Sequence, residues 1–404
     1  MKHLYLLCHS LIIYTKRIPL AWLQLSHQKT RLFVAVSGVA FSIVLIFTQL
    51  GIKAMLFDGV TLLPEHLNGD LYLLSSYSEN IRLSSFPSVY LYQANAIKGV
   101  EQARPLYVNT GSWVDPKLLN YSEKAQQRQS SLMQILAYNP TQPVFDLPQI
   151  NQQANRLAVP GGILYDSFAK AKLGAVPETF AAKGKVTSIL DNRRVTVVGL
   201  FNLGSTFYDE GRAVMSDWNY AQMQGVEKLE EVSVGVLSLK PGTKPQEIIK
   251  RIESTLSRDI KVLTPAELVV GEQKFVAEWP EGKVLNFGAA IAFIIGIVVV
   301  YQVIYTDVSE HLPEYATLKA IGYSDRTLSL IVLEESFLLA MMGFIPGYLI
   351  SYGVYYFLFK FVELPVTMNP LITLQVFLLN LIMCLSAGAI AIRKLRTADP
   401  ADIF

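Results

Sequence analysis

The ionisable residues of this sequence form no familiar catalytic or metal-binding pattern. Its five histidines, at positions 3, 9, 27, 66 and 311, are never spaced as metal ligands, and no His-Glu-x-x-His or Gly-x-Ser-x-Gly motif occurs. A phosphate-binding Gly-x-x-x-x-Gly-Lys-Ser/Thr loop is also missing. The nearest candidate, Pro160-Gly161-Gly162, has no following lysine and predicts a turn. We therefore expect no catalytic site, no metal site and no ATP hydrolysis in this chain.

The carboxylate pair Glu334-Glu335 is a candidate for proton or cation chemistry. It stands just before a long apolar run that begins at Phe337. Ionisable groups beside hydrocarbon are often functional. A solvated pair at the membrane interface is the simpler interpretation, because carboxylates cost little there, and it is the one we favour.

The segment from Val308 to Ser324 mixes fixed charges with apolar residues at helical spacing, namely Tyr315, Leu318 and Ile321. Long apolar runs lie on both sides of it. This pattern predicts a short helix that connects two membrane-spanning helices.

The ends of that short helix can be read from single residues. Pro313 suits a first helical turn, and Gly322 suits the left-handed cap, followed by the apolar Tyr323 that such a cap often packs. Ser324 and Asp325 then predict the start of the next helix.

The segment 314–324 resembles a known signature, E-x-x-x-x-[KR]-A-hydrophobic-G-[AY]-[ST], which follows the second membrane helix of FtsX/MacB-type ABC transporter permeases. From His311 to Tyr323 the sequence is similar to that of the DevC subgroup of cyanobacterial exporters. In that family the element is the coupling helix that docks on the ATPase. On the local pattern alone, an ordinary amphipathic connector at the membrane surface is the alternative.

The resemblance implies a surface that receives motion from a separate ATPase, with charges for registry and apolar residues to fill a groove on the partner. The ATPase-coupling residues we predict are Glu310, His311, Glu314, Tyr315, Leu318, Lys319, Ile321 and Gly322.

The composition indicates a membrane protein. Of the 404 residues 51% are hydrophobic, and the net charge of +2 argues against a nucleic-acid partner. The two cysteines, Cys8 and Cys384, both lie outside the long central region, so no disulfide framework is available there.

Four apolar stretches are long enough to cross about 30 Å of hydrocarbon. They are residues 32–52, 284–305, 337–359 and 371–392. Segment 1–31 is basic, contains no acidic residue and is predicted to end in an interfacial amphipathic helix, and the tail 393–404 is also basic at its start. By the positive-inside rule both termini are cytoplasmic. The coupling helix and connector, 306–336, are then cytoplasmic too, and 360–370 is a short periplasmic loop.

Small residues in the second and third spans predict close helix packing. They are Gly288, Ala292, Gly296, Gly343 and Gly347. Pro346 predicts a kink in the third span.

Residues 53–283 carry charges of both signs and predict a folded periplasmic domain with a stalk. Four strand-like runs occur, at 70–74, 104–109, 195–201 and 232–239, and the last begins a βαβ unit that returns at 259–263. The domain is therefore expected to be mixed α and β.

The Gln/Ser/Pro-rich stretch 121–155 is expected to be an insertion or mobile loop. Segment 265–283 predicts a stalk helix broken near Pro280, with Trp279 either an interfacial anchor or a packing residue.

The order of these elements, together with the closing segment 395–402, is similar to FtsX/MacB-type permeases along nearly the whole chain. The resemblance implies an α-helical inner-membrane protein of four spans with a mixed α/β periplasmic domain. It also implies a permease homodimer in contact with membrane lipids, an ABC ATPase that holds ATP and magnesium, a membrane-fusion adaptor and a TolC-like duct, with lipid or glycolipid as cargo. The alternatives are extraction of lipoprotein or lipid without an adaptor, and FtsX-like regulation of a cell-wall hydrolase.

Overall fold

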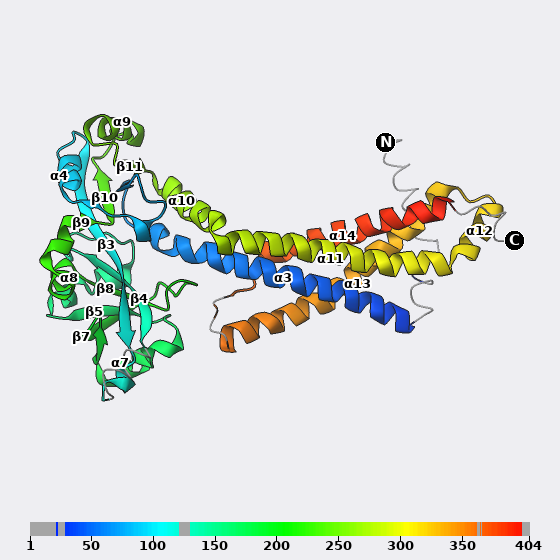
Figure 1. Ribbon diagram of the computed structural model, residues 1–404, viewed down its shortest axis with the longest axis horizontal. Helices are drawn as coiled ribbons and strands as arrows, with labels where there is room; N and C mark the ends of the chain where they lie inside the picture. The colour runs from blue at the N-terminus through cyan, green and yellow to red at the C-terminus, as the bar shows by residue number, and fades with distance from the viewer. Residues whose placement is uncertain (1–21, 23–28, 121–129, 362–363, 365, 398–404) are drawn as a thin grey trace, which may run out of the picture. The chain divides into compact units, whose positions relative to one another are not determined.

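The computed structural model describes residues 22, 29–120, 130–361, 364 and 366–397 (Figure 1). The chain divides into two compact units, each with its own contacts. The helical unit comprises residues 1–53, 284–362 and 366–404, and the sheet unit comprises residues 54–283 and 363–365. The predicted interfacial helix before residue 29 and the last part of the C-terminal signature lie outside the described residues.

The sheet unit is built on nine hydrogen-bonded strands in the order β11-β1-β10-β3-β4-β8-β5-β7-β6, with a separate β2-β9 pair. The strands are β1 (Leu71–Ser75), β2 (Phe86–Pro87), β3 (Val100–Val114), β4 (Ser131–Tyr138), β5 (Gly162–Asp166), β6 (Val186–Leu190), β7 (Arg193–Phe201), β8 (Arg212–Ser216), β9 (Glu231–Val232), β10 (Val234–Leu239) and β11 (Ile260–Leu263). The far end of β3 also pairs with β6, through Trp113 with Leu190 and Val114 with Ile189. This second pairing closes β3, β4, β8, β5, β7 and β6 into a ring.

The predicted βαβ unit is present, with another strand inserted into it. Strands β10 and β11 flank β1, and each is antiparallel to it, so they run parallel to one another. The crossover helix α9 packs on β11 and is seen at one end of the sheet in Figure 1. The helices of this unit are α4 (Val89–Asn95), α6 (Pro148–Asn151), α7 (Val176–Lys183), α8 (Asp217–Gln224), α9 (Pro245–Thr255) and α10 (Pro265–Glu278).

Both faces of the sheet are buried. Along β1, Leu71 and Leu73 belong to one apolar cluster, and Tyr72 and Leu74 belong to another. Successive side chains of a strand point to opposite faces, so this strand separates two cores. Its apolar residues therefore run continuously instead of alternating with polar ones.

The stretch 121–155 is not the loop that its composition predicts. Residues 121–129 lie outside the described part, but β4 follows at Ser131, and α6 and a 3₁₀ turn (Ala154–Ala158) lie beyond it. From Met133 to Tyr138 every residue of β4 is buried. The prediction was wrong because the glutamines and serines around it masked a short apolar run that lies between two cores.

A second correction concerns the strand predicted over 232–239. It is interrupted at Ser233, where β9 leaves to pair with β2 and β10 continues in the main sheet. The Ser233 hydroxyl accepts a hydrogen bond from the Val108 N–H at 3.0 Å, so the side chain takes the place of a ladder bond.

Within the described residues, four helices are long and apolar enough to cross a membrane, judged by length and composition. They are α3 (Lys29–Glu65), α11 (Pro280–Glu310), α13 (Asp325–Phe361) and α14 (Pro370–Thr397), and the short α12 (Leu312–Ala320) lies between α11 and α13. Pro346 lies inside α13, which runs on through it as one helix. The predicted class, four membrane helices plus a mixed α/β domain, is confirmed.

Candidate coupling site and polar network

Helix α12 ends in a complete glycine cap. Gly322 has a φ of +107°, a conformation that glycine adopts without the strain of a Cβ. Its N–H donates to the Lys319 carbonyl and the Tyr323 N–H donates to the Leu318 carbonyl, both at 3.0 Å. These are the two hydrogen bonds of a Schellman motif. The cap predicted at Gly322 is confirmed.

The turn after α12 is held on its other side as well. Ser324 begins α13, because its Oγ accepts from the Thr327 N–H at 3.3 Å. Lys319 Nζ lies 3.2 Å from Asp325 Oδ1, so an ion pair joins the end of α12 to the start of α13. The connector is thus an ordered helix-turn-helix.

The predicted coupling residues differ in exposure. Glu310, Glu314, Ile321 and Gly322 are exposed, while His311, Leu318 and Lys319 are half-buried. Tyr315 is only 1% exposed, and Ala316 next to it is also buried. The expectation that Tyr315 fills a groove on a partner is therefore corrected, because its ring already packs inside the helical unit.

The apolar side chains that the connector does present are Ile321, which is 72% exposed, and Tyr323, which is 44% exposed. Both belong to the turn that follows α12 and not to its body. Helical spacing alone placed Tyr315 and Ile321 on one surface, but the helix ends at Ala320 and the cap redirects the chain.

The predicted small residues lie where helices approach closely. On α13, a Cβ added at Gly343 would collide with Val39 of α3, and one at Gly347 would lie 2.8 Å from Ile43. On α11, a Cβ at Gly288 would lie 3.0 Å from Gln49 Oε1, and one at Gly296 would lie 3.2 Å from Ser42 and collide with Met383. Ala292 between them is 5% exposed. These positions have no space for larger side chains.

The carboxylate pair before the third span is not fully solvated. Glu334 is half-buried, but Glu335 is only 1% exposed. Glu335 shares the inward face of α13 with Val332, Ser336 and Leu339, which are also buried. The interpretation of the pair as an interfacial, solvated feature is corrected for Glu335.

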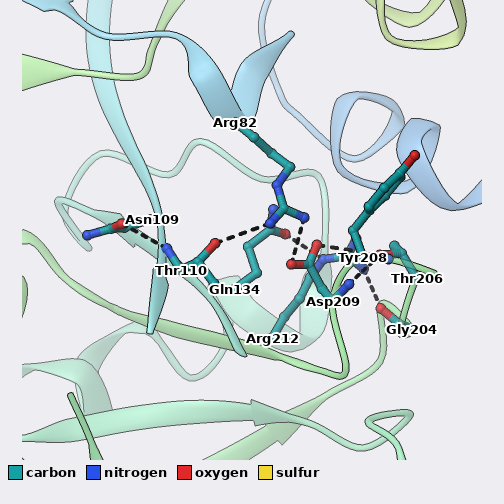
Figure 2. A network of polar contacts seen from close by, with 9 residues as sticks. All are labelled: Arg82, Asn109, Thr110, Gln134, Gly204, Thr206, Tyr208, Asp209 and Arg212. Atoms are coloured by element: carbon teal, nitrogen blue, oxygen red, sulfur yellow. Dashed lines mark hydrogen bonds and ion pairs between the residues drawn. The ribbon is translucent and has the colours of Figure 1, made fainter. Parts of the chain in front are cut away.

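A network of polar side chains lies in the sheet unit, where Arg82, Asp209 and Arg212 meet (Figure 2). Arg82 Nη1 donates to Asp209 Oδ1 at 2.7 Å, and its Nη2 donates to Thr110 Oγ1 at 3.3 Å. Arg212 is 2% exposed and donates through Nε to Gln134 Oε1 at 2.7 Å. Burial lowers the pKa of the Arg212 guanidinium, opposed by the nearby Asp209 and Asp166 carboxylates.

The loop 204–209 is fastened to this network along its length. Arg212 Nη1 donates to the Gly204 carbonyl, and the Asp209 N–H donates to Thr206 Oγ1 at 2.9 Å. The Tyr208 ring lies under the Arg82 guanidinium, 5.9 Å from ring centroid to guanidinium carbon. A loop held by the buried Arg212, the half-buried Arg82 and a cation–π contact is fixed in one conformation.

Both helices that enter and leave the sheet unit reach this loop. From α3, Gly59 faces Thr206, and a Cβ there would lie 3.3 Å from Thr206 Cβ. From the α10 side, the Trp279 ring packs edge-on against Tyr208, with centroids 6.3 Å apart, and against Phe275 at 4.8 Å. Trp279 therefore makes the contacts of a packing residue, one of its two interpretations, and 37% of its surface is exposed.

Glu272 of α10 lines a cavity of about 30 Å³ with Arg82, Asp209 and Arg212. Its carboxylate accepts from the Ile81 N–H at 2.6 Å, and it is 5% exposed. Burial raises the pKa of Glu272 to about 7, although the Ile81 N–H, Lys261 and Arg82 act in the opposite direction. The network can therefore take up a proton near neutral pH.

Comparison with known proteins identifies the C-terminal part of the chain. Residues 286–400 match the family model described as FtsX-like permease C-terminal. These residues form an FtsX-like permease domain. The match begins within α11 and covers α12, α13 and α14, so the connector lies inside the FtsX-like permease domain. The matched residues make up less than a third of the chain, so this comparison describes the C-terminal part alone.

Two solved structures are similar to about half of the chain. The extracellular domain of the noncanonic ABC-type transporter YknZ from Gram-positive bacteria has 10% identity and a TM-score of 0.31, over 49% of this chain and 100% of that one. The periplasmic region of MacB from Actinobacillus actinomycetemcomitans has 8% identity and a TM-score of 0.31, over 52% of this chain and 92% of that one. A comparison with curated proteins found no match.

The polar network of the sheet unit was not predicted from the sequence. Its members come from five separate segments and show no shared spacing. Asp209 lies in a glycine-containing loop, and Arg212 begins strand β8. The only local signal is a run of charge, Asp209-Glu210-Gly211-Arg212, at the entrance to a fully buried strand. Among the described residues, no group of three or more His, Cys, Asp or Glu side chains could hold a metal ion.

Proposed function

We propose that this chain relays ATP-driven motion from a separate ATPase subunit to its sheet unit. The observation that carries the proposal is the FtsX-like permease domain, which contains an ordered, exposed connector between two membrane helices. A separate ATPase subunit needs such an exposed, ordered surface to dock on and to transmit its motion. The docking surface is the turn after α12, with Ile321 and Tyr323 as apolar contacts and Glu310 and Glu314 as charges around them.

The sheet unit is the part that moves the load in this proposal. The loop 204–209 contacts both α3 and the α10 side of the unit, so movement of either helix is passed to the same strands. The glycine cap and the Lys319–Asp325 ion pair hold the connector in one conformation. A rigid connector transmits motion of the ATPase, whereas a flexible one would deform and transmit less of it.

The finer form of the proposal is a tripartite exporter in the inner membrane. Both termini and the connector are cytoplasmic, the sheet unit is periplasmic, and two copies of this chain pair with ATPase subunits that bind ATP and magnesium. A membrane-fusion adaptor and a TolC-like duct complete the path, and lipid or glycolipid is the cargo. The basic flanks 1–31 and 393–404 support the orientation, and the DevC-like wording of 311–323 supports the assembly and cargo.

The proposal is tested by copurifying the full-length chain with its ABC ATPase subunit. Ile321→Asp buries a charge in the docking surface, and we expect it to weaken association at least tenfold. Ile321→Leu keeps the side chain apolar, and we expect it to retain association. Equal recovery of the ATPase with Ile321→Asp and with the unmodified chain would show that the docking surface lies elsewhere.

The orientation is tested with a single thiol at Ser324, which is exposed on the connector. In a background with Cys8→Ser, the remaining natural thiol, Cys384, is buried. We expect Ser324→Cys to react with a membrane-impermeant maleimide only after the cells are opened. Labelling in intact cells would place the connector outside, where no cytoplasmic ATPase could reach it.

A further inference from the structure

A surface pocket of about 320 Å³ lies between the sheet and helix α8, away from the network of Figure 2. Its floor is apolar and comes from neighbouring strands, Ile163 of β5, Val195 of β7 and Met215 of β8. All three floor residues are buried in the same core cluster. At this size the pocket falls at the lower end of the range of small-molecule sites, and is about twice a cavity that holds benzene.

One wall of the pocket is fixed before any ligand arrives. The Asn219 side chain accepts from the Gly161 N–H at 3.0 Å and donates to the carbonyls of Leu157, Val159 and Gly162 at 3.0 to 3.1 Å. Gly161 has a φ of +66°, so the Pro160-Gly161-Gly162 turn needs its glycine. A wall held by four hydrogen bonds needs no ordering on binding.

The rim of the pocket carries an aromatic ring and positive charge. Trp218 is 52% exposed, so its ring is accessible at the pocket. Arg193 and Arg194 are both exposed, and within the described chain neither has an ion pair or a side-chain hydrogen bond. No acidic residue lines the pocket, and the nearby Asp191 already accepts from the Ser112 N–H and from Gln224.

Strand geometry assigns the two arginines different roles. Alternate residues of β7 share a face, so Arg193 lies on the face of Val195, which forms the pocket floor. By the same rule the Arg194 side chain starts from the opposite face, and the Arg194 carbonyl, which faces Gly161, is the part of this residue that lies at the pocket. The Arg193 guanidinium is therefore the group positioned to meet an anion above an apolar floor, and its planar fork matches a carboxylate or phosphate.

We propose that this pocket binds a small amphiphilic anion, with a carboxylate or phosphate on Arg193 and an aromatic or short aliphatic body between Trp218 and the floor. Ile163, Val195 and Met215 exclude water from that body, and Trp218 covers it. The site is independent of the coupling connector, which belongs to the helical unit.

The test uses the full-length chain in lipid nanodiscs, labelled with 5-fluorotryptophan, and 4-phenylbutyrate as the probe. The fluorine signal of Trp218 is assigned by its loss in Trp218→Phe. We expect a saturable shift of this signal with a dissociation constant near 1 mM, as is usual for about a dozen non-hydrogen atoms. The signal of the buried Trp113 is expected to stay in place and serves as the internal reference.

Two comparisons test the roles assigned here. Arg193→Ala removes the anion partner and is expected to weaken binding at least tenfold, as is replacement of the probe by the neutral 4-phenylbutanamide. Arg258→Ala removes an equal charge from an exposed position outside the pocket and is expected to leave binding unchanged. The proposal is overturned if the Trp218 signal does not shift saturably up to 10-fold above the expected constant, or if Arg193→Ala binds as tightly as the unmodified chain.

Discussion

Glu272 makes the stability of the sheet unit depend on pH in a direction that can be calculated. Burial raises its pKa from 4.5 to about 7 in the folded chain. Between these two values the folded state binds more protons than the unfolded state, so stability falls as pH rises. The gap corresponds to about 3 kcal/mol, of which roughly 2.5 kcal/mol is lost between pH 5 and pH 8. At 5% exposure, solvent screens this effect little.

Glu272→Gln should remove that dependence and keep the local geometry. The amide oxygen can still accept from the Ile81 N–H, but the side chain no longer titrates. We therefore expect the free energy of unfolding of the variant, relative to the unmodified chain, to rise by roughly 2.5 kcal/mol from pH 5 to pH 8. The sign is informative, because a carboxylate stabilised by Arg82 and Lys261 as an ion pair would give the opposite slope.

The assay is urea unfolding of the full-length chain in detergent, followed by tryptophan fluorescence. Three of the four tryptophans, Trp113, Trp218 and Trp279, lie in the sheet unit and report on it. Glu278→Gln is the control, because Glu278 is exposed on the same helix and pairs only with Lys274, at 3.7 Å. If the unmodified chain and Glu272→Gln lose the same free energy between pH 5 and pH 8, the carboxylate is not buried as described and the reasoning fails.

Two further predictions concern packing and buried charge. Gly343→Ala should destabilise the helical unit by about 1–3 kcal/mol through its collision with Val39. Gly353→Ala on the same helix places its Cβ in open space and should not destabilise the unit. Thermal melting of the two variants in detergent compares their stabilities. Arg212→Met should lower the free energy of unfolding by about 3–5 kcal/mol, since it removes the positive charge beside the buried carboxylates of Asp209 and Asp166. The exposed Arg258→Met should cost under 1 kcal/mol in the same urea assay, and similar losses in both would contradict the role given to Arg212.

Local signals in the sequence were sufficient to predict those features of the fold that depend on one short segment. The cap at Gly322 follows from the left-handed conformation that only glycine adopts easily, and the helix start at Ser324 follows from its hydroxyl. The crossover from β10 through α9 to β11 was legible from periodicity and a Pro-Gly turn. The position of β1 between β10 and β11 could not be predicted, because pairing between strands so far apart in the sequence has no local signal in either segment.

The failures share a physical cause. Tyr315 was placed on a surface because spacing identifies a helix face but does not say which neighbour covers it. Strand β4 was overlooked because composition averaged over a long stretch hides six buried residues. The network around Arg212 requires segments more than a hundred residues apart to meet, and only the folded sheet brings them together.

The closure of six strands into a ring leaves the main sheet with a single edge. Within the described part of the chain, β6 pairs with β7 and, through Ile189 and Leu190, with β3, so β11, which is four residues long, is the strand that has no partner along one side. Lys261 in that strand reaches back to the Ser78 carbonyl at 2.5 Å. A short edge with a lysine is a poor template for an added strand from another molecule. Partners of this domain should therefore recognise its side chains and loops, and not extend its sheet.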